Sequence, residues 1–262
     1  MTSCRLALVG IALSALPFCC EGAPKSLSAT HVKEWFQWVI PLPKEIGVKG
    51  QITLPAGDIR VRVRDAATDA EQQALRIVQD ILLRSTGTDG TTGKAFDILL
   101  GVVDADGRIG TTAIPGVTRL RELPNPDQAY LIRTVGDNQL VLAALAPAGV
   151  YYAALTLSGL IEGKAKGAEV ALPLGEITDW PDMAERGEWG CSSSRDIEWL
   201  AARKMNLVEF HTVHQVEADG TVTTAINQGY LARGRRHAVR MVPIISHLNS
   251  MGRRGAYKAY PE

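Results

Sequence analysis

Residues 59–64 alternate between apolar and charged side chains, Ile-Arg-Val-Arg-Val-Arg, and this pattern restricts the fold more than any other part of the sequence. A period of two residues is typical of a strand with one buried and one wet face. Apolar residues at helical spacing follow from about Asp69 to Arg84, with Gly87 as a stop. The apolar run over 96–103 predicts a core strand before a turn. Strand, helix and strand in this order indicate an α/β domain.

A second α/β unit follows the first. The apolar segments 130–135 and 139–144 flank Gly136-Asp137-Asn138, which is a hairpin signal. Residues 149–161 then have the apolar spacing of a helix. These elements predict an N-terminal α/β domain over residues 24–175.

The pattern changes near Glu176, where short strand and helix signals begin to alternate. The expected elements are strands over 186–190, 206–212 and 241–247, separated by helices over 194–205 and 227–240. Alternating strands and helices are how a parallel barrel begins, and a complete barrel takes about 250 residues. The predicted fold class is therefore α/β, with the N-terminal sheet-and-helix domain followed over residues 176–262 by an incomplete (β/α)8 TIM-type barrel of about three strands.

The first 22 residues have the features of an export signal. Arg5 supplies a positive start, residues 6–16 form a short apolar run, and small residues follow for cleavage. The run is shorter than the roughly 20 residues that span a bilayer, so a stable transmembrane span is not expected. We expect an exported protein, periplasmic or extracellular, with a lipid anchor at Cys19 or Cys20 as the alternative.

The charges of the chain balance, with 28 Lys and Arg against 28 Asp and Glu. No net field favours nucleic acid or an anionic membrane surface, so neither is an expected partner. A neutral sugar fits this balance, and no cofactor is expected. Cys191 is the one cysteine of the expected mature chain, where a small buried role is favoured over a nucleophile.

Several short motifs match, in chain order, those at the joint between two domains of a known enzyme family. The matching segments are Tyr130-Leu131-Ile132, the Gly-x-x-Tyr…Thr-Leu pattern within 149–157, Ile177-Thr178-Asp179-Trp180-Pro181-Asp182 before Arg186-Gly187, and Lys204-Met205-Asn206 before His211. In these motifs the chain resembles family 20 β-N-acetylhexosaminidases, over roughly residues 44–247. The resemblance implies the N-terminal α/β domain of that family plus the start of its catalytic barrel.

Other segments depart from the family pattern. After Arg-Gly the chain reads Glu188-Trp189-Gly190-Cys191, closer to family 84 or family 67 glycosidases than to the usual Leu-Asp-x-Ser-Arg. The expected second strand ends in His211, followed by His214, where family 20 has His-x-x-Asp. The expected third strand lacks the Pro-Glu-Ile-Asp motif of the family. The substrate within this group of enzymes is therefore open.

The resemblance implies substrate-assisted, retaining hydrolysis of terminal N-acetylhexosamine, in which the acetamido group of the substrate attacks its own anomeric carbon. An Asp orients that group, and the adjacent Glu protonates the leaving oxygen. In the family this pair follows the fourth barrel strand. Because the chain is expected to stop near the third strand, no catalytic residue is assigned here.

Arg186 is the first of four residues that are predicted to bind the sugar. It is expected at the C-terminal end of the first barrel strand and matches the family arginine whose guanidinium holds adjacent hydroxyls. The alternative is an ion pair with Asp179 or Asp182.

The other predicted sugar-binding residues are His211, His247 and Trp189. Both histidines are expected where the second and third strands end, on the face where barrel sites form, and Trp189 offers a flat stacking face. A structural role is the alternative for each. His214 follows three residues after His211, but no third ligand accompanies them, so no metal site is expected.

These observations lead to one expectation and two alternatives. We expect a glycoside hydrolase that acts on N-acetylhexosamine-containing glycans in its full-length form, with this chain a fragment without the catalytic pair. One alternative is a non-catalytic exported module that binds glycans or packs on a partner. The other is an α-glucuronidase or O-GlcNAc-hydrolase-like enzyme, favoured by Arg-Gly-Glu-Trp-Gly at 186–190.

Overall fold

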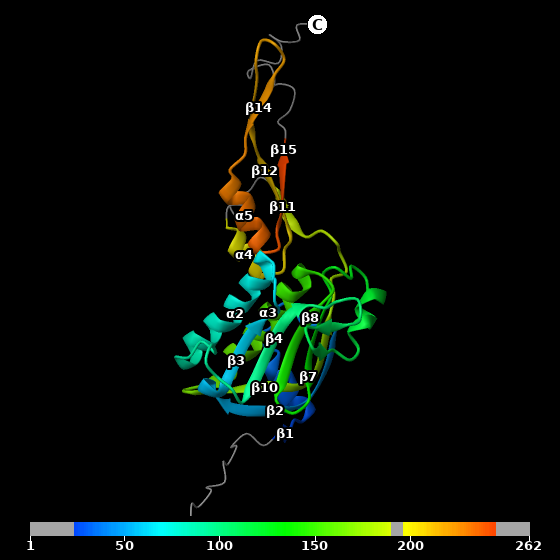
Figure 1. Ribbon diagram of the computed structural model, residues 1–262, viewed down its shortest axis with the longest axis vertical. Helices are drawn as coiled ribbons and strands as arrows, with labels where there is room; N and C mark the ends of the chain where they lie inside the picture. Colours follow the sequence, from blue (N-terminus) through cyan, green and yellow to red (C-terminus); the bar gives the residue numbers. More distant parts are fainter. Residues whose placement is uncertain (1–23, 190–195, 245–262) are drawn as a thin grey trace, which may run out of the picture.

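A large mixed sheet forms the lower half of the computed structural model, which describes residues 24–189 and 196–244 (Figure 1). From one edge to the other its strands are β1 (Lys25–Ser26), β2 (Glu45–Pro55), β10 (Glu169–Asp179), β7 (Tyr130–Val135), β8 (Gln139–Ala144), β4 (Phe96–Val102) and β3 (Ile59–Val63), with β9 (Ala165–Lys166) paired to β10. Strands β3, β4 and β8 are parallel, whereas β7, β10 and β2 join antiparallel. The mixed α/β class predicted from the sequence is confirmed.

The helices α2 (Asp69–Thr86) and α3 (Pro147–Glu162) cover one face of this sheet. The Thr68 side chain caps the start of α2, and Gly87 ends it in the left-handed conformation with φ of 80°. Both helices bury apolar side chains against alternate residues of the central strands, including Ile98 and Leu100 of β4. The helix expected between Asp69 and Arg84 is confirmed.

Short elements cover the other face of the sheet. Leu99 of β4 points to this side, because successive side chains of a strand alternate between faces. It packs with residues of the 3-10 helix η2 (Val117–Glu122) and of β5 (Arg108–Ile109), which pairs with β6 (Thr112–Ala113). The remaining short elements are α1 (Ala29–Trp35) and the 3-10 helix η1 (Ala56–Asp58). Burial on both faces explains why β4 is apolar from Ile98 to Val102.

The strands β2 and β10 were not among the elements expected from the sequence. They pair over their whole lengths, with a register shift between Leu174 and Gly175. Strand β10 continues to Asp179, so the expected domain boundary at 175 and 176 falls inside a strand of the large sheet.

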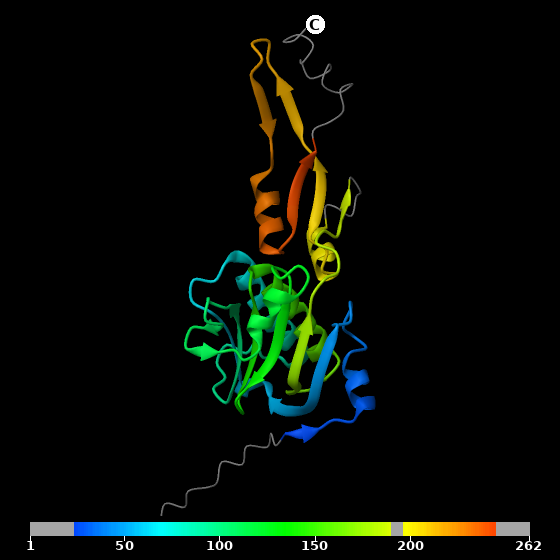
Figure 2. The ribbon, with the colours of Figure 1, turned by 90° about the vertical axis from the view of Figure 1, so that its right-hand side faces the viewer.

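A second, smaller sheet follows, made of β11 (Gly187–Trp189), β12 (Leu207–His211) and β15 (Arg240–Ile244) in parallel. The helix α4 (Ile197–Ala202) connects β11 to β12, and α5 (Gln228–Arg236) precedes β15. The hairpin of β13 (Val213–Val216) and β14 (Val222–Ala225) extends beyond the sheet, which gives the described chain an elongated shape (Figure 2). The predicted alternation of strand and helix is confirmed here, although α4 and α5 are shorter than expected.

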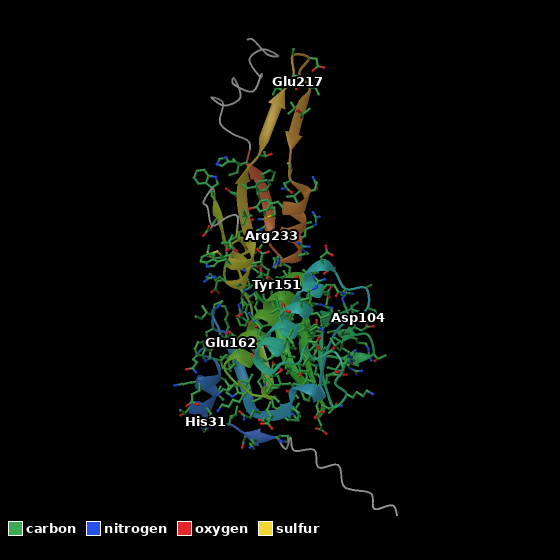
Figure 3. The ribbon with its side chains drawn as sticks, turned by 90° about the vertical axis from the view of Figure 1, so that its left-hand side faces the viewer. His31, Asp104, Tyr151, Glu162, Glu217 and Arg233 are labelled. Carbon is green, nitrogen blue, oxygen red and sulfur yellow. The ribbon has the colours of Figure 1, made fainter. Side chains whose placement is uncertain are left out.

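The two sheets are joined through buried side chains. The hydroxyl of Tyr151 on α3 lies 3.0 Å from Nδ1 of His237, just after α5, at the level where the two parts meet (Figure 3). Burial lowers the pKa of His237 below its usual value, against the opposing attraction of Glu198. Among the described residues, no helix has the length and apolarity to cross a membrane.

Candidate functional site

One face of the small sheet is covered by α5. Phe210 of β12 meets Tyr230 of α5 with the ring centroids 5.4 Å apart and the ring planes at 90°. Gly234 of α5 lies against the side chain of Met241 in β15, and Val208 is fully buried. These residues fix which side of the sheet faces the helices.

The opposite face gathers Trp189, Glu209 and His211, which we call the strand-end face. Glu209 and His211 are two residues apart in β12, so their side chains lie on the same side. Trp189 is the register partner of Glu209 in the neighbouring parallel strand, and therefore shares that side. Trp189 and His211 are also the last residues of β11 and β12. Two of the predicted site residues are thus brought to one face at the carboxyl ends of parallel strands.

The strand-end face combines groups that suit a sugar. The side chain of Trp189 is 62% exposed and offers a large flat apolar surface with a polar edge. His211 is exposed, and Glu209 supplies carboxylate acceptors. Glu209 was missed from the sequence, although period-two alternation in Glu-Phe-His would have placed it beside His211.

Arg186 lies at the other end of the first strand. It precedes β11 instead of standing at the carboxyl end where it was expected, so it does not join Trp189 and His211. Its guanidinium donates to the backbone oxygen of Lys204 at 3.0 and 2.7 Å, to Met183 O at 2.6 Å and to Gln128 Oε1 at 2.9 Å. Neither Asp179 nor Asp182 is its partner in the described chain: Lys204 pairs with the former and Lys44 with the latter. The position favours a structural role.

The remaining predicted residues have side chains that the structure does not describe. His247 and Cys191 lie beyond the described residues, and for His214 only the backbone position in β13 is described. Within the described part of the chain, no group of three His, Cys, Asp or Glu residues is arranged to hold a metal ion.

A buried polar cluster joins the end of the large sheet to the start of the small one. The Tyr130 hydroxyl donates to Asp179 Oδ2 at 2.9 Å and lies 2.6 Å from Thr156 Oγ1. Tyr130 and Asp179 are register partners in β7 and β10. Lys204 Nζ donates to the Tyr130 hydroxyl at 2.9 Å and to Asp179 Oδ2 at 3.0 Å. Burial lowers the pKa of Lys204, and the attraction of Asp179 opposes that effect. Burial, reinforced by Asp179, raises the pKa of Tyr130 well above its ordinary value.

A cavity of about 500 Å³ opens beside this cluster, and we call it the junction cavity. Its walls include Ile40, Leu42, Trp180 and Met183, together with Tyr130, Asp179 and Lys204 of the cluster. Because Arg186 and Lys204 stand before β11 and β12, the junction cavity lies at the amino ends of these strands, away from the strand-end face.

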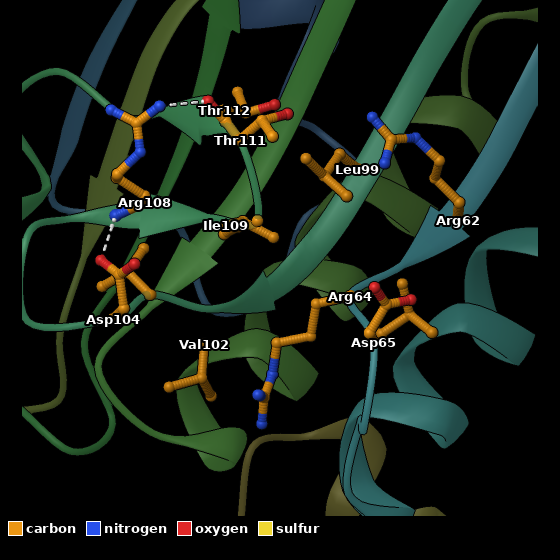
Figure 4. A pocket seen from close by; sticks show the side chains of 13 residues that line it. Arg62, Arg64, Asp65, Leu99, Val102, Asp104, Arg108, Ile109, Thr111 and Thr112 are labelled. Atoms are coloured by element: carbon orange, nitrogen blue, oxygen red, sulfur yellow. Dashed lines mark hydrogen bonds between the residues drawn. The ribbon is translucent and has the colours of Figure 1, made fainter.

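A second cavity, of about 420 Å³, lies where β3 and β4 end (Figure 4). Arg62, Arg64 and Arg108 line it. Each has partners within the protein: Asp97 pairs with Arg62, the buried Glu71 pairs with Arg64, and Arg108 donates to the backbone oxygen of Thr111. Arg62 and Arg64 are therefore neutralised by carboxylates, and Arg108 is held by a backbone oxygen.

The fold is shared with solved carbohydrate-active enzymes. The GH20 exo-β-N-acetylglucosaminidase from Vibrio harveyi is 18% identical with a TM-score of 0.55, and the match covers 91% of this chain and 40% of that one. Flavobacterium johnsoniae chitobiase is 18% identical with a TM-score of 0.56, covering 87% and 37%. The GH20 β-N-acetylhexosaminidase from Streptomyces coelicolor A3(2) is 18% identical with a TM-score of 0.54, covering 80% and 46%. The chain thus spans less than half the length of each, and at this identity the likeness shows the fold.

The sequence itself carries the family signal. A comparison with curated proteins found no match. Residues 37–180, more than half of the chain, match the model of glycosyl hydrolase family 20, domain 2. This segment runs from just after α1 to the end of the large sheet and includes Tyr130, Tyr152 and Asp179 of the junction. The chain therefore belongs to glycosyl hydrolase family 20.

Proposed function

We propose that this protein is a carbohydrate-active protein of glycoside hydrolase type that binds N-acetylhexosamine-containing glycans at its strand-end face. In this proposal residues 187–244 begin a (β/α)8 barrel, and further strands complete the wall around the sugar. Hydrolysis of terminal N-acetylhexosamine by a substrate-assisted, retaining mechanism then belongs to a longer form that carries an Asp-Glu pair.

The observation that carries the proposal is the placement of Trp189, Glu209 and His211 on the face of three parallel strands that is turned away from α5. In barrels of alternating strands and helices, the helices lie outside and the sites form at the carboxyl ends of the strands. A tryptophan face beside hydrogen-bonding groups suits a pyranose ring, which has apolar faces and a hydroxyl-bearing rim. The V. harveyi relative was solved in complex with N-acetylglucosamine, which supports this sugar as the first to be tested.

The test is a calorimetric titration with N,N′-diacetylchitobiose. Replacing Trp189 by alanine is expected to weaken binding by about two- to tenfold, because a stacking aromatic contributes on the order of 0.5–1.5 kcal/mol beyond its buried area. Trp199→Ala is the matched control, since Trp199 is also exposed but lies on α4. Equal affinity of both variants, or no binding by the unaltered protein, would remove the strand-end face from the proposal. Binding without hydrolysis by a longer form would favour the non-catalytic alternative.

A further inference from the structure

The junction cavity contains more positive than negative charge. Four cations line it, Lys44, Arg186, Arg203 and Lys204, against the two carboxylates Asp179 and Asp182. Lys44 pairs with Asp182 at 2.7 Å and Lys204 with Asp179 at 3.0 Å. No acidic side chain of the described chain forms an ion pair with Arg186 or Arg203, whose partners are neutral oxygens and aromatic rings.

The cavity also holds hydrogen-bond donors that the protein leaves unused. Two of the three N–H groups of the Lys204 ammonium donate to Tyr130 and Asp179, and the third has no partner among the described residues. Arg186 donates through four of its five N–H groups, to Lys204, Met183 and Gln128, and so contributes mainly its charge to the cavity.

Tyr152 supplies a further donor. Its side chain is 2% exposed, and its hydroxyl has no hydrogen-bond partner within the described part of the chain. Burial raises the pKa of this tyrosine to about 12, with the nearby Arg186 acting in the opposite direction, so the hydroxyl keeps its proton and can donate. The centre of the Arg186 guanidinium is 5.7 Å from the centroid of the Tyr152 ring, and both residues line the cavity.

The acceptors of the cavity, in contrast, are used. Asp179 Oδ2 accepts from Tyr130 and Lys204, and Oδ1 accepts from the backbone N–H of Lys44 at 3.3 Å. A buried donor without a partner costs about 1–3 kcal/mol, so a ligand that brings acceptors and negative charge is favoured over one that brings donors.

The rim and walls are apolar. Ile40, Leu42 and Met183 are 79%, 60% and 65% exposed, although they are large hydrophobic residues, and Trp180 completes the wall. A cavity of this size, between two parts of a chain, with apolar walls and a few convergent polar groups has the properties of small-molecule sites.

We propose that the junction cavity binds a small organic carboxylate with an apolar body, the carboxylate facing Lys204, Arg186 and Tyr152 and the body lying against Trp180 and Met183. This site is separate from the strand-end face and does not depend on the proposed glycan binding. The second cavity at the ends of β3 and β4 carries no such inference, because its arginines are engaged within the protein.

Saturation-transfer NMR and calorimetry with benzoate, acetate and benzyl alcohol test the proposal. Benzoate is expected to bind, with acetate weaker because it lacks the apolar body and benzyl alcohol weaker because it lacks the charge. Tyr152→Phe is expected to weaken benzoate binding about tenfold through the lost donor to a charged acceptor. Tyr151→Phe is the matched control, because Tyr151 is its buried neighbour but donates to or accepts from His237 and does not line the cavity.

Thermal melting of both variants shows whether each is folded before the titrations are compared. No binding of benzoate would overturn the proposal. Equal affinity for benzoate and benzyl alcohol would overturn it too, because the unused donors and the positive charge would then contribute nothing to binding. Equal benzoate affinity of Tyr152→Phe and Tyr151→Phe would overturn it as well.

Discussion

Glu71 illustrates how a single buried carboxylate organises its surroundings. It is fully buried and accepts from the Arg64 guanidinium at 2.6 and 2.9 Å, from the Thr68 backbone at the start of α2 and from the Val102 backbone at the end of β4. Burial on its own would raise the pKa of Glu71, but these hydrogen bonds outweigh it and hold the pKa below the usual value. One side chain therefore ties β3, α2 and β4 together.

Replacing Glu71 by glutamine is expected to lower the free energy of unfolding by about 3 kcal/mol, because one partner of a largely buried pair is lost. Urea unfolding measures this change, and Glu162→Gln, an exposed glutamate on α3, is the control. The folded pKa is depressed, so the contribution is present above the unfolded pKa near 4.5 and is lost as the pH falls through the folded value. If the difference in the free energy of unfolding between Glu71→Gln and the unaltered protein stayed constant down to strongly acid pH, this explanation would be contradicted.

At the same scale, the sequence predicted part of the candidate site. His211 could be placed because it follows the apolar residues of the expected strand over 206–212, and Trp189 because it lies in the short strand expected over 186–190. The position of Arg186 could not, since the register of β11 against β12 begins one residue later, at Gly187 and Leu207. The junction cluster was also missed, because Tyr130, Asp179 and Lys204 are brought together only by the tertiary fold.

At the scale of elements, predictability follows the regularity of the pattern. The strands β3, β4, β7 and β8 and the helices α2 and α3 have uninterrupted periodicity, and all were expected. Strand β10 contains Pro173 and Gly175, residues that normally argue against a strand interior. In its pairing with β2, the register shift at Gly175 absorbs the irregularity there, and Pro173 stays in register with Gln51.

Gly175 is expected to be intolerant of a side chain. Its φ is 137°, a conformation that residues with a Cβ rarely adopt, and an added Cβ would lie 2.3 Å from the backbone oxygen of Gly47. Gly175→Ala should destabilise the protein by on the order of 1–3 kcal/mol, measured by thermal or urea unfolding. Gly57→Ala is the control, since an added Cβ there would meet nothing within 4 Å. Similar stability of the two variants would show that the strand relaxes without strain.

At the scale of the whole molecule, two sheets of different construction share one chain. The large sheet is a closed core with both faces covered, and the junction cluster holds it against the small sheet. The small sheet has helices on one face and exposes Trp189 and His211 at the edge where its strands end. Glycan binding is therefore expected at one end of the small sheet and carboxylate binding at the other.

The five tryptophans of the chain, Trp35, Trp38, Trp180, Trp189 and Trp199, allow this arrangement to be tested in one measurement. We suggest recording the indole N–H signals by ¹⁵N NMR while N,N′-diacetylchitobiose is added, with each signal assigned from a Trp→Phe variant. The account predicts that the Trp189 signal shifts in proportion to binding and that those of Trp35, Trp38 and Trp180 stay in place. An unmoved Trp189 signal, or a shift confined to Trp180 or Trp38, would contradict the central claim that the sugar lies on the strand-end face.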